Sequence, residues 1–139
     1  MSRSGYSDDC DDIWLYRQAV ENAIKGKRGQ AFFRGLVEAL DAMPEKRLIA
    51  SAFNKPEGCC ALGALGRHKG VDLSDLEPAE EYGEPEHVNH RAVAKRFDIA
   101  RSLSAEVQFM NDEWDSPETP EQRWQRMRRW AAANLRRGQ

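Results

Sequence analysis

The chain has 139 residues, of which 32% are charged, and its 21 Lys and Arg against 23 Asp and Glu leave a net charge of −2. This near-neutral balance argues against a protein that coats DNA and against an acidic mimic of DNA. No apolar run reaches the roughly 18–20 residues of a membrane span, and the N-terminal sequence lacks the apolar core of a secretory signal. Three cysteines, two of them adjacent, do not form a disulfide framework, so we expect a reduced cytoplasmic protein that does not contact membranes.

Two helices are predicted at the start of the chain. Apolar residues at helical spacing over 13–24 indicate the first helix, with Ser7 as its N-cap. A second apolar stripe over 29–43 indicates another helix, which Pro44 ends. We expect the two helices to form an antiparallel pair.

The next segment predicts a β-hairpin followed by a helix. The apolar run at 47–53 is closed by the turn-forming sequence NKPEG, and the chain is expected to return as a strand through Cys59 and Cys60. A helix from about Cys60 to His68 would then end at Gly70. Residues 71–86 are rich in glutamate and predict an acidic loop with brief helical turns.

Three helices are predicted in the remainder. Patterns over 87–97 and 99–110 indicate two of them. The last helix has a clear start signal, because Thr119, Pro120 and Gln122 stand at the N-cap, first and third positions of a capping box.

The predicted fold class is mainly α, a single compact domain over residues 1–139 with five to six helices and one short β-hairpin. Residues 1–6 are expected to be a disordered end.

The sequence EGCCALGALGRHKG admits an enzymatic interpretation. A thiol at Cys60 would lie at a helix start, where unpaired N–H groups and the positive end of the helix dipole favour a thiolate. A cysteine-dependent hydrolase or transferase also needs a base and an orienting group. The candidates are three histidines and an adjacent amide and carboxylate: His68, His87, His90, Asn111 and Asp112.

The favoured interpretation of the same stretch is packing. Free cysteine is among the most often buried residues, and Gly63 and Gly66 allow another segment to approach the helix closely. No catalytic set is therefore favoured. His87 and His90 are spaced to share a helix face, but four ligands in a zinc-like spacing are missing, so we expect no metal and no cofactor.

Residues 92–107 have the outline of a helix-turn-helix. Arg101, Ser102 and Ser104 would lie on the outer side of the second helix, where base or phosphate contacts are made. Glu106 and the acidic residues that follow would repel phosphates. A small DNA-binding regulator is thus an alternative, and nucleic acid is a possible partner that is not favoured.

The last helix combines arginines with tryptophan, the residues enriched at interface hot spots. Trp124 and Met127 fall on its apolar stripe and are expected in the core. We expect a protein partner to contact the remaining basic and aromatic positions: Arg123, Arg126, Arg128, Arg129 and Trp130.

The segment CALGALGR, followed at a distance by NDEW and a Thr-initiated helix, resembles small uncharacterised proteins of bacteria and their phages. The resemblance spans residues 28–135. Its matching positions are Cys60, Gly63, Ala64, Leu65, Asn111, Asp112 and Thr119. It implies a phage- or prophage-associated, non-enzymatic binding protein, with inhibition of a host defence complex as one expected role.

Overall fold

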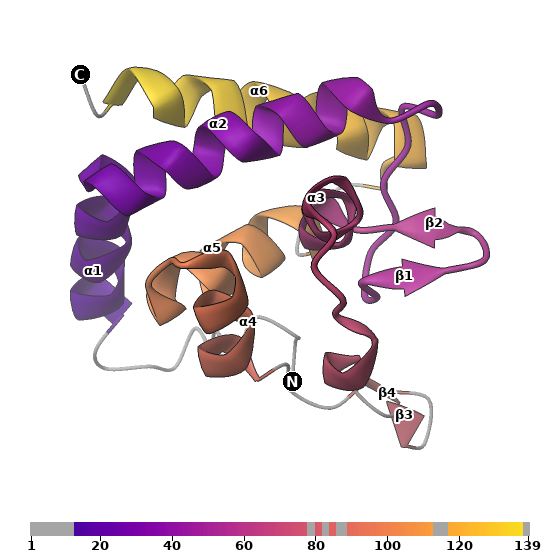
Figure 1. Cartoon of the computed structure of the whole chain (residues 1–139), viewed down its shortest axis with the longest axis horizontal. Coiled ribbons are helices and arrows are strands. Elements are labelled where there is room, and N and C mark those ends of the chain that lie inside the picture. The colour runs from indigo at the N-terminus through magenta and orange to yellow at the C-terminus, as the bar shows by residue number, and fades with distance from the viewer. Residues whose placement is uncertain (1–12, 78–79, 82–83, 86–88, 113–116, 138–139) are drawn as a thin grey trace.

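The computed structural model describes residues 13–77, 80–81, 84–85, 89–112 and 117–137 (Figure 1). Ser7 and His87 lie outside these residues. The described part of the chain contains six α-helices: α1 (Ile13–Lys25), α2 (Lys27–Ala42), α3 (Ala61–Lys69), α4 (His90–Phe97), α5 (Arg101–Asp112) and α6 (Pro120–Arg137). The mainly α fold class is confirmed. None of these helices combines the length and apolarity needed to cross a bilayer.

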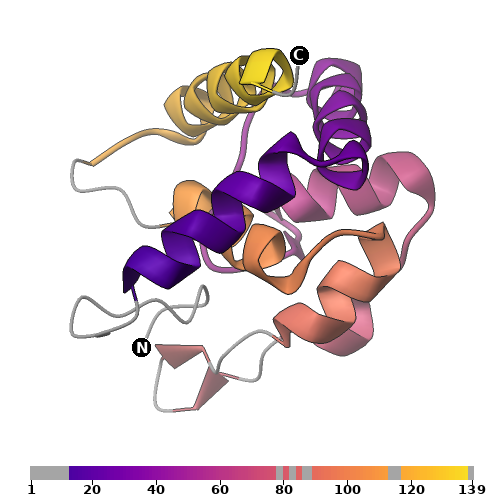
Figure 2. The same cartoon turned by 90° about the vertical axis from the view of Figure 1, so that its left-hand side faces the viewer.

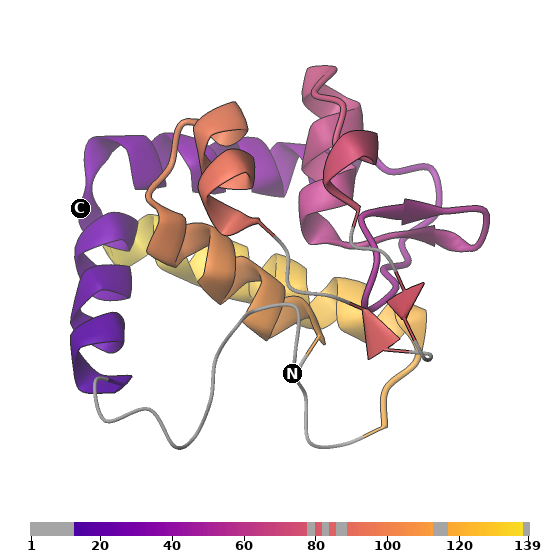
Figure 3. The ribbon, with the colours of Figure 1, turned by 90° about the horizontal axis from the view of Figure 1, so that it is seen from below.

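Helices α2 and α6 lie side by side and run antiparallel, and α5 lies beneath them with α4 at its side (Figures 1 and 3). Helix α1 meets α2 at a corner instead of lying along it, so the predicted antiparallel pairing of these two helices is wrong. The reason is the connection, because only Gly26 separates α1 from α2 and one residue is too short to reverse a helix. Helix α1 packs on α5 instead.

The core lies between the α2–α6 pair and α5. Its largest fully buried side chains include Phe33, Leu40, Leu65, Leu103 and Met127. Aromatic rings connect the helices edge to face: Phe33 lies 5.4 Å from Phe32 and 5.3 Å from Trp130, and Phe32 lies 6.4 Å from Phe97, centroid to centroid.

The predicted hairpin exists but is displaced along the chain. Its strands are β1 (Asn54–Lys55) and β2 (Gly58–Cys59), paired antiparallel. The run at 47–53 is not a strand, although Ile49 N donates a hydrogen bond to Cys59 O at 2.9 Å. Apolar character predicts burial of this run, and the burial is real for Leu48 and Phe53, but it does not fix strand pairing.

The acidic segment contains more regular structure than a loop with helical turns. A 3₁₀ turn, η1 (Ser74–Leu76), is followed by a second antiparallel pair, β3 (Glu80–Glu81) and β4 (Glu84–Pro85). Strands of two residues are too short to leave an alternating pattern in the sequence.

The helix ends follow local sequence signals closely. Thr119 N donates to Gln122 Oε1 at 2.9 Å and Gln122 N donates to Thr119 Oγ1 at 3.1 Å, which confirms the capping box. Helix α3 begins after Cys60 and ends at Gly70, whose φ of 72° is the left-handed C-cap conformation that glycine favours.

Candidate functional site

Both cysteines of the CC pair are buried, each with about 1% of its surface exposed. Cys60 is the N-cap residue of α3, but its side chain makes no capping hydrogen bond. One turn later, a Cβ on Gly63 would lie only 1.8 Å from Phe53 O, so glycine is required for the segment before β1 to touch the helix. The structure therefore places Cys60 inside a close contact between α3 and the chain that precedes the hairpin.

The thiol of Cys59, next to Cys60 in the chain, is not activated. Burial raises the pKa of the Cys59 thiol above its ordinary value, against the opposing effect of the Arg67 charge. A raised pKa keeps the group protonated at neutral pH, and the thiol form is a poor nucleophile.

Asn111, the candidate orienting amide, is a buried structural hub. Its Oδ1 accepts a hydrogen bond from Ala61 N at 3.1 Å, and its Nδ2 donates to Ile49 O at 3.0 Å. Asp112 Oδ1 accepts from Ser51 N at 3.1 Å and from Asn111 Nδ2 at 2.7 Å. The Asn-Asp pair at the end of α5 thus satisfies a first-turn N–H of α3 and fixes the loop at 49–51.

His90 is buried at the start of α4, and its Nδ1 lies 3.0 Å from Ser104 Oγ on α5. This contact joins the two helices. His68 lies exposed in the last turn of α3. In the part of the chain that the structure describes, no group of three or more His, Cys, Asp or Glu could hold a metal ion.

The helix-turn-helix outline is present as α4 and α5, with Asp98 in the left-handed conformation at the turn. Helix α5 is the central helix of the fold, and six consecutive residues from Leu103 to Gln108 are buried. Ser104 is among them, so only Arg101 and part of Ser102 of the proposed DNA contacts reach the surface. A recognition helix needs an exposed face to enter a groove. The described residues of α5 offer almost none.

Glu106 is a buried carboxylate on α5. Arg17 of α1 reaches it, with Nη1 at 2.6 Å from Oε2. Burial nevertheless raises the pKa of Glu106, and the charge and hydrogen bond of Arg17 oppose that shift. This pair fastens α1 to α5.

Two of the arginines assigned to a partner surface face inward. Arg126 Nη2 and Arg123 Nε lie 2.7 Å and 3.2 Å from Glu118 Oε1, and all three side chains are largely buried. The hydrogen bond from Arg126 lowers the pKa of Glu118. Arg123 also donates to Asn111 O at 2.9 Å, so these cations lie at the C-terminus of α5, where the helix dipole favours positive charge.

The other three candidate residues on α6 differ from one another in their contacts and exposure. Arg128 makes two hydrogen bonds of 3.1 Å to the Asp41 carboxylate of α2, and this contact lowers the pKa of Asp41. Trp130 packs against Phe33, and Arg129 is exposed. Of the five positions predicted to contact a partner, Arg129 is exposed, and Arg128 and Trp130 are partly exposed.

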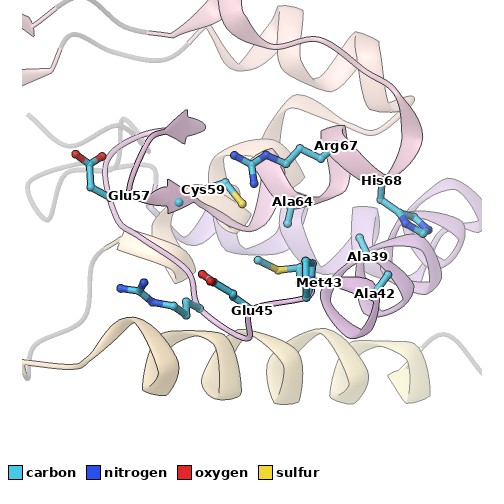
Figure 4. Close-up of a pocket in the computed structure, with 12 residues that line it drawn as sticks. Ala39, Ala42, Met43, Glu45, Glu57, Cys59, Ala64, Arg67 and His68 are labelled. Atoms are coloured by element: carbon cyan, nitrogen blue, oxygen red, sulfur yellow. The ribbon is translucent and has the colours of Figure 1, made fainter.

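A recess beside the hairpin was not anticipated from the sequence. It has a volume of about 370 Å³, and we call it the hairpin recess. Its apolar wall comes from three elements and from the residue that follows α2: Ala39 and Ala42 of α2, Met43, Cys59 of β2 and Ala64 of α3 (Figure 4).

Four charged side chains and one histidine surround this apolar wall: Glu45, Arg47, Glu57, Arg67 and His68. Arg67 extends from α3 toward the hairpin (Figure 4) and donates a hydrogen bond to Asn54 Oδ1. Arg47 Nε lies 3.3 Å from Glu121 Oε1. The residues come from segments 39–47, 57–59 and 64–68, and no pattern in the sequence signals that they converge.

The chain matches no protein-family model, and no curated protein or solved structure is similar enough to be matched to it. The resemblance to small bacterial and phage proteins thus stays a prediction.

Proposed function

We propose that this chain is a non-enzymatic binding protein and that its hairpin recess takes an apolar side chain of a protein partner. The observation that carries the proposal is the recess itself, with its apolar wall and charged rim. Interface hot spots are large side chains that fill such pockets, surrounded by polar contacts that exclude water.

The charged rim suits a protein better than a small apolar ligand. Glu45 and Glu57 stand with Arg47 and Arg67 around the opening, so both signs of charge are available to a partner's polar groups. Electrostatic complementarity at a rim contributes specificity and association rate more than affinity.

The enzymatic alternative has less support. Cys60 is buried, Asn111 is committed to the backbone of α3 and the 49–51 loop, and His90 is committed to Ser104. The finer part of the proposal is a phage- or prophage-associated protein in a reducing cytoplasm that inhibits a host defence complex. It depends on the resemblance of the CALGALGR segment and the Asn111-Asp112 pair to small bacterial and phage proteins.

The test is a pair of tryptophan substitutions on exposed helical alanines. Ala42→Trp places an indole in the recess, whereas Ala133→Trp adds the same side chain to the exposed face of α6, away from the recess. Tagged wild type and both variants are used to capture proteins from bacterial lysates, and a stoichiometric partner is then purified for titration calorimetry.

We expect wild type and A133W to bind the purified partner equally, and A42W to lose at least about tenfold in affinity, as for loss of one hot-spot pocket. Equal binding by A42W, or failure of every lysate to yield a stoichiometric partner, would contradict the proposal.

A further inference from the structure

A second recess is lined by residues from the α1–α2 corner, the end of α3 and the α4–α5 turn, three parts of the fold that lie near one another (Figure 2). Its volume is about 310 Å³. Lys27, Arg28, Lys69 and Asp98 line it, and Phe32 and Phe97 form its apolar part. We call it the basic corner. Three cations and one carboxylate give its lining a formal charge of +2.

The charges of this corner are poorly compensated inside the chain. Lys27 and Arg28 occupy the first turn of α2, where positive charge opposes the helix dipole, and that turn contains no acidic residue. Arg28 Nη1 lies 3.2 Å from Asp98 Oδ1, an exposed pair. Among the described residues, neither Lys27 nor Lys69 takes part in an ion pair.

Lys69 is held at the corner by the shape of α2. It extends from the last turn of α3 across Gly35, and a Cβ at Gly35 would lie 3.0 Å from Lys69 Cε and 3.3 Å from Nζ. Because Gly35 has no side chain, the Lys69 side chain can lie directly against the surface of α2. Lys69 and Lys27 thus line the same recess although they are 42 positions apart in the sequence.

We infer that the basic corner binds an acidic segment of a protein partner, with carboxylates meeting Lys27 and Lys69 and an apolar side chain over the Phe32–Phe97 part of the recess. Carboxylates of a partner would complement the positive charges of the two lysines. An apolar side chain would cover Phe32 and Phe97, so the recess favours a segment that contains both acidic and apolar residues. The inference rests on the proposed function in that the occupant is a protein.

The corner itself favours carboxylates of a protein over the phosphates of a nucleic acid. The Asp98 side chain is 82% exposed at the recess, and it would face a phosphate strand that offers only negative charge. A protein segment can place a hydrogen-bond donor opposite Asp98 and carboxylates opposite the lysines.

The test uses the whole chain and a defined probe, a fluorescein-labelled peptide of Glu-Glu-Leu repeats, with a Gln-Gln-Leu peptide and a duplex DNA as comparison probes. Binding is measured by fluorescence anisotropy at two salt concentrations. The corner is altered in Lys27→Glu/Lys69→Glu, and Lys55→Glu reverses one charge on the exposed hairpin, away from the corner. Asp98→Asn removes the competing carboxylate while keeping a residue that tolerates the left-handed conformation.

We expect the acidic peptide to bind wild type and K55E in a salt-dependent manner, to bind K27E/K69E at least about tenfold more weakly, and to bind D98N more tightly. Equal binding by K27E/K69E, equal binding of the Gln peptide, or no binding of the acidic peptide to wild type would overturn the inference. Binding of DNA that depends on the lysines, without binding of the peptide, would overturn it in favour of nucleic acid. Ala42→Trp alters only the hairpin recess, so its result tests the proposed function. The result for the lysine variants tests the basic corner independently.

Discussion

At the scale of single residues, Asn111 does the most to organise the fold. The side-chain amide of Asn111 links the first turn of α3 to the segment before the hairpin. The backbone carbonyl of Asn111 accepts a hydrogen bond from Arg123. Buried polar groups of the backbone must find partners, and here a side chain from α5 supplies them for two other segments.

We predict that Asn111→Ala lowers the free energy of unfolding by about 3 kcal/mol, because Ala61 N and Ile49 O would be left without a partner in the interior. Asn111→Asp should be no better, since its carboxylate would face Ile49 O and Asp112. Urea denaturation followed by circular dichroism measures the effect.

The control is Asn22→Ala, which removes an exposed asparagine from α1 and should change the free energy by less than about 0.5 kcal/mol. If Asn111→Ala is as mild as this control, the amide is not the hub that its contacts indicate.

At the scale of secondary structure, α3 shows how tertiary contacts stabilise a short helix. The helix has nine residues, and its first six are buried. It is too short to be stable in isolation, so packing must supply its stability. Gly63 permits the backbone of Phe53 to lie directly against it.

We predict that Gly63→Ala lowers the free energy of unfolding by about 2 to 3 kcal/mol, because the new methyl group would overlap Phe53 O and neither backbone can move freely. Thermal and urea denaturation measure this. Gly35→Ala in α2 is the matched control.

At Gly35 the neighbouring atoms belong to the flexible end of Lys69, and alanine also favours the helix, so the control should be neutral or slightly stabilising. A stable Gly63→Ala variant would mean that α3 and the segment before β1 are not packed as described.

The same scale explains why the arginine-rich α6 is a poor guide to a partner. Arg123 and Arg126 meet Glu118 and the carbonyl end of α5, and Arg128 meets Asp41 of α2. Charged residues on a helix can form ion pairs with neighbouring elements of the same chain as well as with a partner protein.

At the scale of the whole molecule, the enclosure of the two thiols reports the integrity of the core. Cys59 and Cys60 belong to the hydrophobic cluster that spans α1 to α6. A reagent should reach them only when the structure opens.

Cys10 is replaced by serine so that only Cys59 and Cys60 can react with a thiol reagent. We predict that the reagent labels these two residues in the native protein only through unfolding. The labelling rate should rise with urea in parallel with the unfolded fraction, and mass spectrometry identifies the labelled residue. Burial raises the pKa of Cys59, so the native rate should also show no early rise with pH below the ordinary thiol range.

Fast labelling of native Cys60 at neutral pH would contradict this picture. It would also favour the cysteine-dependent hydrolase or transferase over the binding protein and call for a search for its substrate.

The sequence alone determined the features that depend on neighbours along the chain. Helices were placed to within a few residues by apolar spacing, Gly70 and the Thr119 capping box, because these signals act within one turn of backbone. Only the tertiary structure decided which way side chains face and which distant segments meet. It buried Cys60, turned Arg123 and Arg126 inward, and assembled the hairpin recess and the basic corner. A helix presents residues on every side, and which side meets a neighbour depends on how all the elements pack together.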